Sequence, residues 1–257
     1  MFRVDMKGAT VALTMEQPPV NAINDAWIDG VNRVLDSYEQ RDDVRVLRFR
    51  SALKVFCAGA EIDMLVERLS NPSGVLKMVA EVRRMQALYL RIERSPLVSI
   101  AEINGAALGG GFELSLACDF RVAADTAKVG LPEARLGLLA AAGGTQRLTK
   151  LFGSALARRL LLGTEVLDGA EAARLGLVHW SYPAEQLAAK TDELAQRLES
   201  VPKRALDANK QCIFAAQERQ ADAAEVEIRG TTACYEDPEA MLRLKSFLAQ
   251  RRTPRSR

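Results

Sequence analysis

The sequence predicts an α/β fold, with alternating strands and helices to about residue 180 and a helical C-terminal region after it. Three observations predict this class. Short apolar or alternating segments, typical of strands, recur through the first 180 residues. Segments with apolar residues at helical spacing separate them. Beyond residue 180 almost every segment has helical spacing, and no Gly/Ser-rich linker divides the chain. We therefore interpret 1–180 as the core and 181–257 as a helical region that is not an independent domain.

The predicted strands and helices follow one another in a regular order. Two strands surround a Lys7-Gly8 turn, and the first helix begins at the cap residue Asn24. Pro96 separates a long helix from a continuously apolar segment that reads as a buried strand. The predicted strands are 2–6, 9–15, 44–49, 97–103, 120–124 and 177–181. The predicted helices are 24–38, 75–94, 109–117, 155–162, 169–175, 184–199, 204–216, 221–234 and 238–248.

Composition and charge exclude several classes of protein. The chain has 35 Lys and Arg against 33 Asp and Glu, so no overall field favours nucleic acid or a membrane surface as a partner. The four cysteines form no Cys-x-x-Cys pair, which favours reduced thiols over disulfides or a zinc site. The first residues do not resemble a signal peptide, and no segment approaches the ~20 apolar residues of a membrane span. We therefore expect a cytoplasmic protein with no membrane contact.

Two glutamates carry the clearest signal for chemistry. Glu113 and Glu133 are 20 positions apart, and each follows a backbone turn. Glu113 closes the glycine-rich segment Leu108–Glu113, and Glu133 follows Pro132. Glycines let the backbone approach a ligand closely, and the free N–H groups of a helix N-terminus bind anions. We expect the helix dipole to favour the ionised form of Glu113 in the first turn.

A second small-residue turn, Phe56–Ile62, opens another helix and can supply a further N–H donor. Two donors from separate turns form an oxyanion hole. A pair of carboxylates beside an oxyanion hole suits proton transfer at a carbon next to a carbonyl. Each feature alone also has a structural explanation. Glycines allow tight packing, acids are common in first helical turns, and Glu133 could form a surface salt bridge with Arg135 or Arg147.

Other enzyme classes lack their motifs. The sole histidine, His179, has no Gly-x-Ser-x-Gly segment to accompany it, so a structural histidine is favoured over a serine hydrolase. A glycosidase with paired carboxylates is disfavoured by the glycine-rich turns and by an aromatic content of only 5%. The phosphate-binding motif Gly-x-x-x-x-Gly-Lys-Ser/Thr is absent from the sequence.

The order of these motifs resembles that of the enoyl-CoA hydratase/isomerase family, which has the crotonase fold. The segments that carry the resemblance are Pro19–Asn24, Phe56–Ile62, Ile103–Asp119, Leu131–Glu133, Leu136–Gly137, Gly143–Leu148 and Ala172–Val178. The resemblance implies a crotonase-type spiral of ββα units. It also implies that the C-terminal helical region, 181–257, makes oligomer contacts and covers the acyl-CoA site, in a homotrimer or a dimer of trimers.

The resemblance assigns roles to the residues of the turns. The backbone N–H groups of Ala60 and Gly110 match the oxyanion hole that holds a thioester oxygen. Glu113 and Glu133 match the two carboxylates that family hydratases place around one water. The residues that match substrate-binding positions are Ala58, Ala60, Ile62, Gly109, Leu136 and Gly137. No metal and no cofactor is implied, since coenzyme A enters as part of the substrate.

These matches predict an enoyl-CoA hydratase of fatty acid β-oxidation, which converts a 2-trans-enoyl-CoA into a 3-hydroxyacyl-CoA. Addition of water needs a base for the water and an acid for carbon, whereas a double-bond shift needs one group that carries a proton. Keeping both Glu113 and Glu133 therefore favours a hydratase. The alternatives are an enoyl-CoA isomerase, another acyl-CoA enzyme of the crotonase fold, and a non-catalytic acyl-CoA-binding subunit.

One segment departs from the family pattern. Leu139-Ala140-Ala141-Ala142 stands where family hydratases commonly have Ile-Pro-Gly-Ala. Because this loop borders the expected active site, we expect the departure to affect the acyl pocket or the placement of water.

Overall fold

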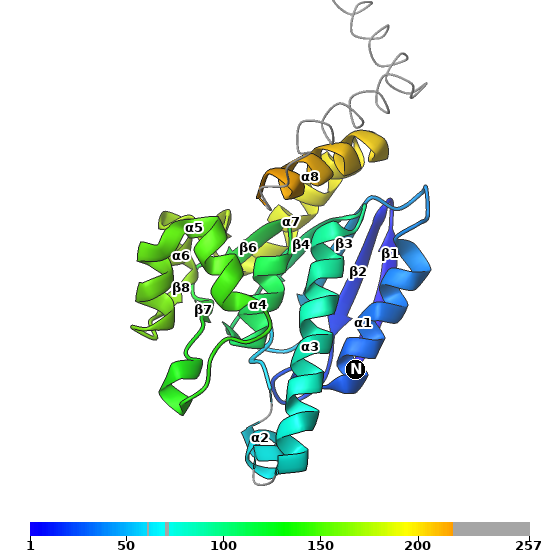
Figure 1. The fold of residues 1–257 in the computed structure, drawn as a ribbon. Helices are drawn as coiled ribbons and strands as arrows, with labels where there is room; N and C mark the ends of the chain where they lie inside the picture. Colours follow the sequence, from blue (N-terminus) through cyan, green and yellow to red (C-terminus); the bar gives the residue numbers. More distant parts are fainter. Residues whose placement is uncertain (61, 70–71, 218–257) are drawn as a thin grey trace, which may run out of the picture.

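The computed structural model describes residues 1–60, 62–69 and 72–217 (Figure 1). The strands are β1 (Phe2–Lys7), β2 (Thr10–Met15), β3 (Val46–Ser51), β4 (Val98–Ile103), β5 (Ala107–Leu108), β6 (Phe120–Ala124), β7 (Lys128–Gly130), β8 (Val166–Asp168) and β9 (Trp180–Tyr182). The α-helices are α1 (Asp25–Tyr38), α2 (Ile62–Leu69), α3 (Pro72–Arg94), α4 (Gly110–Ala117), α5 (Gly144–Leu161), α6 (Gly169–Arg174), α7 (Ala184–Glu199) and α8 (Lys203–Gln217). A 3-10 turn, η1, spans Glu133–Leu136.

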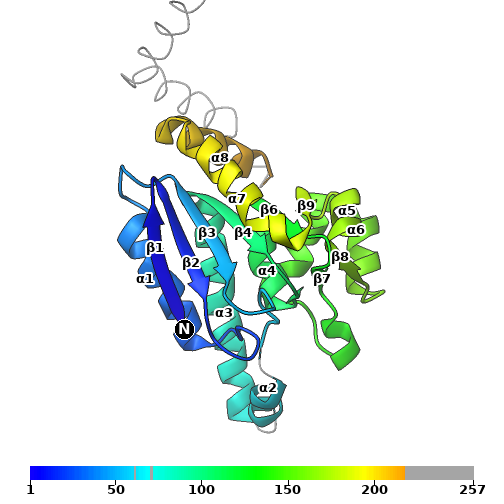
Figure 2. The ribbon, with the colours of Figure 1, turned by 180° about the vertical axis from the view of Figure 1, so that it is seen from behind.

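The strands form two sheets. The larger has the order β1-β2-β3-β4-β6-β9, in which β1 and β2 are antiparallel and the remaining pairs are parallel (Figure 2). The smaller has the order β5-β7-β8, with β5 parallel to β7. Parallel neighbours require crossover connections, which α1, α3 and α4 supply as far as β6, and the chain that contains α5 and α6 connects β6 to β9.

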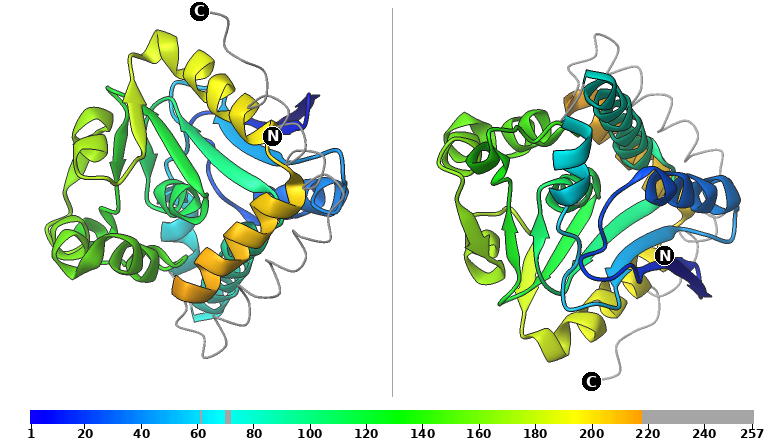
Figure 3. Two further views of the ribbon diagram at one scale, coloured as in Figure 1. Left: turned by 90° about the horizontal axis from the view of Figure 1, so that it is seen from above. Right: turned by 90° about the horizontal axis from the view of Figure 1, so that it is seen from below.

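Helices cover both faces of the larger sheet. Helices α1 and α3 lie on one face, α7 packs against β3, β4 and β6, and α4 lies between the two sheets (Figures 1 and 3). The core contains Trp27 of α1, Tyr89 of α3 and Phe49 of β3, all fully buried. Burying a large apolar side chain stabilises the fold by roughly 1.5–3 kcal/mol, so this packing holds the helices against the sheet.

Most of the predicted elements are present. The predicted cap of the first helix is confirmed, since the Asn24 side chain accepts a hydrogen bond from the N–H of Trp27 at 2.9 Å. The predicted strand 44–49 lies two residues further on, as β3. The predicted helix 155–162 is the second part of α5, which begins earlier and has non-helical backbone at Gly153. The short strands β5, β7 and β8 were not predicted. The predicted helices 221–234 and 238–248 lie outside the described residues.

The described part of the C-terminal region is joined closely to the core. Lys210 of α8 is buried, and its Nζ donates to the carbonyls of Ile92 and Leu97 and to Asp119. A buried ammonium group with three acceptors holds α8 to the ends of α3 and α4. None of the helices in the described ranges is long and apolar enough to cross a membrane.

Candidate active site

The smaller sheet brings the two glutamates together. Strand β5 leads into α4, which carries Glu113, and β7 leads into η1, which begins with Glu133. The two strands are parallel, with Leu108 opposite Gly130, and the N–H of Gly109 donates to the carbonyl of Gly130 at 3.1 Å. Because parallel strands end at the same edge of a sheet, both glutamates lie at one edge.

Glu113 is buried and is held by backbone amides. The residue is only 3% exposed, and its Oε1 accepts a hydrogen bond from the N–H of Gly144 at 2.8 Å. Burial, with a smaller contribution from the nearby charge of Glu133, raises the pKa of Glu113 to about 7. The amides of Gly144 and Ala142 and the charge of Arg147 oppose this increase in the pKa. The helix dipole does not decide the form of Glu113 by itself, because desolvation raises the pKa and is the larger effect.

Glu133 is half-buried, and its carboxyl is not paired with any arginine that the structure describes. Its Oε2 is buried without a hydrogen-bond partner among the described residues. Burial raises the pKa of Glu133. The alternative of a surface salt bridge is wrong: Arg135 bonds to Thr164, and Arg147 forms an ion pair with Glu93. A carboxyl with an unused buried oxygen is available to a ligand or a water.

The two turns that carry Ala60 and Gly110 lie side by side. The N–H of Leu108 donates to the carbonyl of Cys57 at 3.0 Å, and a Cβ added to Gly59 would lie 3.2 Å from the nitrogen of Gly110. Within the part of the chain that the structure describes, the amides of Ala60 and Gly110 donate to no backbone carbonyl. Both amides are therefore free of a described backbone acceptor, as an oxyanion hole requires of its donors.

Comparison with known proteins identifies the family of this chain. A family model described as enoyl-CoA hydratase/isomerase matches residues 5–249. This chain belongs to the enoyl-CoA hydratase/isomerase family. The resemblance expected from the motifs is therefore confirmed, and so is the crotonase fold.

Relatives and solved structures agree with this membership. The chain is 41% identical over 174 residues to mouse enoyl-CoA hydratase domain-containing protein 2, mitochondrial, which is 67% of this chain and 57% of the relative. It is 42% identical over 166 residues to a probable enoyl-CoA hydratase of Bacillus subtilis, 65% of this chain and 63% of the relative. These matches thus span less than two thirds of the relatives' lengths. A crystal structure from Geobacillus kaustophilus, titled as an enoyl-CoA hydratase, superposes with a TM-score of 0.91 at 30% identity and covers 98% of this chain and 95% of that chain.

The remaining predicted substrate-binding residues lie on the two turns and on η1. The amide of Ala58 is used within the protein, donating to the carbonyl of Val20 at 3.1 Å. Gly109 lies beside Glu133, whose Oε1 would be 3.0 Å from a Cβ added there. Leu136 is 62% exposed, and Gly137 follows it at the end of η1. The side chain of Ile62 lies outside the described residues.

The loop that departs from the family pattern is fixed from two sides. Arg147 binds Glu93 through two hydrogen bonds of 2.8 and 2.7 Å, and its Nη1 donates to the carbonyl of Ala142 at 2.9 Å. Gln86 of α3 donates to the carbonyl of Ala141 at 2.6 Å. The loop leads directly to Gly144, which binds Glu113, so these contacts position the amide that holds the carboxyl. Sequence periodicity gave no signal for them, because it identifies buried faces and not hydrogen-bond partners.

Tyr89 connects α3 to the expected oxyanion hole. It is fully buried, and its hydroxyl donates to the carbonyl of Gly110 at 2.9 Å. Burial raises its pKa well above the ordinary value, so the hydroxyl keeps its proton. Helical spacing placed Tyr89 on a buried face of the predicted helix, but the bond to Gly110 was not predicted.

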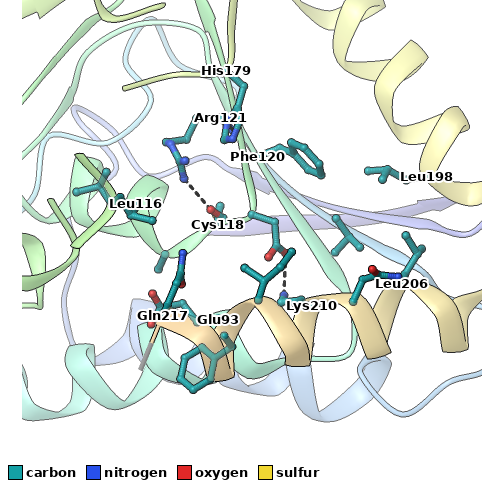
Figure 4. A pocket seen from close by; sticks show the side chains of 17 residues that line it. Glu93, Leu116, Cys118, Phe120, Arg121, His179, Leu198, Leu206, Lys210 and Gln217 are labelled. Atoms are coloured by element: carbon teal, nitrogen blue, oxygen red, sulfur yellow. Dashed lines mark hydrogen bonds and ion pairs between the residues drawn. The ribbon is translucent and has the colours of Figure 1, made fainter. Parts of the chain in front are cut away.

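A cavity of about 420 Å³ lies at the other end of α4 and is lined by the core and α8 (Figure 4). Neither Glu113 nor Glu133 lines this cavity. His179 does, and its Nδ1 accepts a hydrogen bond from the N–H of Arg121 at 3.1 Å. Burial lowers the pKa of His179 to about 4, so the ring is neutral at pH 7. These contacts favour the structural role expected for the histidine. No cluster of three or more His, Cys, Asp or Glu side chains in the described ranges is arranged to hold a metal ion.

Proposed function

We propose that this protein is an enoyl-CoA hydratase that adds water across the double bond of a 2-trans-enoyl-CoA and forms a 3-hydroxyacyl-CoA. One observation carries the proposal: the carboxyls of Glu113 and Glu133, one buried and one half-buried, share one site beside the amides of Ala60 and Gly110, which donate to no backbone carbonyl among the described residues. An isomerase needs only one carboxyl for its proton transfer, so the pair favours a hydratase.

The reaction needs one ionised and one protonated carboxyl. The carboxylate takes a proton from water as the water oxygen forms a bond to C3, and the carboxylic acid gives a proton to C2. The pair thus holds the same number of protons before and after the reaction. The pKa of about 7 for Glu113 lets this group take either form near neutral pH, which suits general acid–base catalysis.

The amides of Ala60 and Gly110 would stabilise the thioester oxygen as negative charge develops on it. In other enzymes, removal of one such donor raises the barrier by about 2.7–4 kcal/mol. The Tyr89 hydroxyl donates to the Gly110 carbonyl and thereby holds the peptide unit that follows the Gly110 amide. The backbone is therefore fixed before the substrate binds.

The side chains next to Glu133 in the sequence favour an apolar acyl group. Leu136, Leu138 and Leu139 are 62%, 36% and 65% exposed on η1 and the loop after it. Rat methylglutaconyl-CoA hydratase is 38% identical over 159 residues, which is 62% of this chain and 49% of that relative. A branched substrate with a carboxylate is therefore the alternative to compare with a straight-chain enoyl-CoA.

The test is the loss of 2-enoyl thioester absorbance when the purified protein is added to crotonyl-CoA, to a longer 2-enoyl-CoA and to 3-methylglutaconyl-CoA. We expect rapid loss with formation of a 3-hydroxyacyl-CoA. Binding of the thioesters without turnover, or conversion of a 3-enoyl-CoA to a 2-enoyl-CoA only, would contradict the hydratase assignment.

Gly109 offers a prediction about the geometry of Glu133. Its backbone has φ 53° and ψ −128°, a conformation that only glycine adopts readily. We expect Gly109→Ala to lower the free energy of unfolding by about 1–3 kcal/mol. We also expect it to lower kcat about tenfold, or about 1.4 kcal/mol in the barrier, because the added Cβ crowds the Glu133 carboxyl.

Gly176→Ala is the matched control for this prediction. Gly176 also has a positive φ, of 78°, but a Cβ added there would have no neighbour within 4 Å. Denaturant unfolding and crotonyl-CoA hydration are measured for both variants. Equal kcat values in the two variants would show that Gly109 matters only to stability.

We propose that no cofactor or metal takes part, that the chain forms a homotrimer or a dimer of trimers through its C-terminal region, and that it acts in the cytoplasm in fatty acid metabolism. The names of several relatives include the word mitochondrial, which states the location of those relatives and not of this chain. Light scattering at several protein concentrations would test the assembly.

A further inference from the structure

The segment Pro19–Asn24 has no role in the mechanism, although it contains a fully buried polar residue. Asn21 is 0% exposed and has a positive φ of 53°. Its Oδ1 accepts a hydrogen bond from the N–H of Gln17 at 2.8 Å. Its Nδ2 donates to Ser51 Oγ at 2.8 Å and to the carbonyl of Phe56 at 2.9 Å. The side-chain amide therefore joins the end of β3 to the segment that leads to Ala60.

The backbone around Asn21 holds the same segment. Cys57 Sγ donates to the carbonyl of Asn21 at 3.1 Å, and the N–H of Ala58 donates to the carbonyl of Val20 at 3.1 Å. The N–H of Ile23 donates to the carbonyl of Gly59 at 3.0 Å. Residues 56–59 are thus fixed along one side by the chain around Asn21.

The other side of residues 56–59 is fixed by the chain that leads to Gly110. The N–H groups of Phe56 and Cys57 both donate to the carbonyl of Ala106 at 3.0 Å, and Leu108 donates back to Cys57. The segment before Ala60 is therefore held between Asn21 and the turn before Gly110. Its position sets where the Ala60 amide lies relative to the Gly110 amide.

We propose that Asn21 is a positioning residue that aligns the Ala60 amide with the Gly110 amide, so that both polarise one thioester oxygen. The inference rests on the proposed function of this site. Asparagine has the required properties together: it tolerates a positive φ, and it supplies an acceptor for Gln17 and two donors for Ser51 and Phe56. Aspartate keeps the shape and the acceptor but loses both donors, and its charge repels the Phe56 carbonyl.

Asn21→Asp tests the proposal, and Asn104→Asp is its control. The Nδ2 of Asn104 donates to the carbonyl of Leu53 at 2.7 Å, in the same loop but without a side-chain bond to residues 56–59. We expect Asn21→Asp to lower kcat at least tenfold relative to Asn104→Asp, with KM changed less than threefold. Thermal unfolding of both variants measures the loss of stability that the two changes share.

A spectroscopic measurement separates positioning from stability. A conjugated 2,4-dienoyl-CoA absorbs at longer wavelength when its thioester carbonyl is polarised, and Glu113→Gln is used as the background so that the ligand is not consumed. We expect the shift on binding to shrink with Asn21→Asp and to persist with Asn104→Asp. Equal shifts in the two variants would overturn the proposal.

Two further outcomes are distinguishable. If the protein hydrates no enoyl-CoA but the shift is lost with Asn21→Asp, the proposed function is wrong and the role of Asn21 is supported. If Asn21→Asp does not fold, Ser51→Ala removes one acceptor of the Asn21 amide and is measured in the same way. A smaller shift than in the parent would then support the proposal, and an unchanged shift would overturn it.

Discussion

Glu113→Gln and Glu133→Gln should each lower the turnover of 2-enoyl-CoA hydration by at least ~10²-fold, which is the low end for loss of a general acid–base group. Glutamine keeps the size of the side chain, and its Oε1 can still accept the bond from the Gly144 amide that Glu113 receives at 2.8 Å. The fold should therefore be retained while proton transfer is lost. Hydration of crotonyl-CoA under saturating substrate measures the effect.

The control for this prediction is another buried glutamate. Glu102 on β4 is 7% exposed and forms an ion pair with Arg48, outside the candidate site. Glu102→Gln should lower stability and leave the kcat of the folded protein nearly unchanged. A Glu113 or Glu133 variant that hydrates crotonyl-CoA at nearly the parent rate has no acid–base role at that position.

The two glutamine variants also separate the roles of the two carboxyls in hydration and in isomerisation. If Glu113→Gln abolishes hydration but retains conversion of a 3-enoyl-CoA to a 2-enoyl-CoA, then Glu133 alone is sufficient to move a proton between carbons. This result would support the argument that hydration needs both groups. Loss of both reactions in both variants would show instead that the pair acts as one unit in every proton transfer.

Local sequence patterns were sufficient to predict the larger elements and the helix starts. The cap at Asn24 and the apolar run of β4 depend on residues close together in the sequence, so their signals survive without tertiary context. The strands β5 and β7 have only two and three residues, too few to show a period. Their pairing brings Glu113 and Glu133 to one edge of the smaller sheet, so the local motifs indicated each glutamate, but the placement of the two together was expected from the family resemblance.

The environment of each glutamate depends on residues far away in the sequence. Arg147 was a candidate partner for Glu133, but it is engaged by Glu93, on a different helix. Glu113 was expected to be ionised from its place in α4, but the loop before α5 buries it. Helix position is a local property, whereas desolvation depends on which distant segment covers the group, and the second effect is larger here.

This burial predicts that Glu113 destabilises the folded protein at high pH. Its pKa is about 7 when folded, above its ordinary value of 4.5, so the folded state binds more protons than the unfolded state between these values. The free energy of unfolding therefore falls, through this group, as the pH rises from about 4.5 to about 7. A shift of this size corresponds to about 3 kcal/mol. Glutamine does not titrate, so Glu113→Gln should be more stable than the parent by about this amount above pH 7, and the difference should vanish below about pH 4.5.

Denaturant unfolding at several pH values measures this difference directly. Glu133 faces the same site, and its charge contributes to the raised pKa of Glu113. In a Glu133→Gln background the pKa of Glu113 should therefore fall, and the stability gained by Glu113→Gln above pH 7 should shrink. A gain that is the same at all pH values would contradict a buried, titrating carboxyl, since it would come from packing alone. A gain that depends on pH but not on Glu133 would show that burial without the second carboxyl raises the pKa, and the two groups would then not share one site.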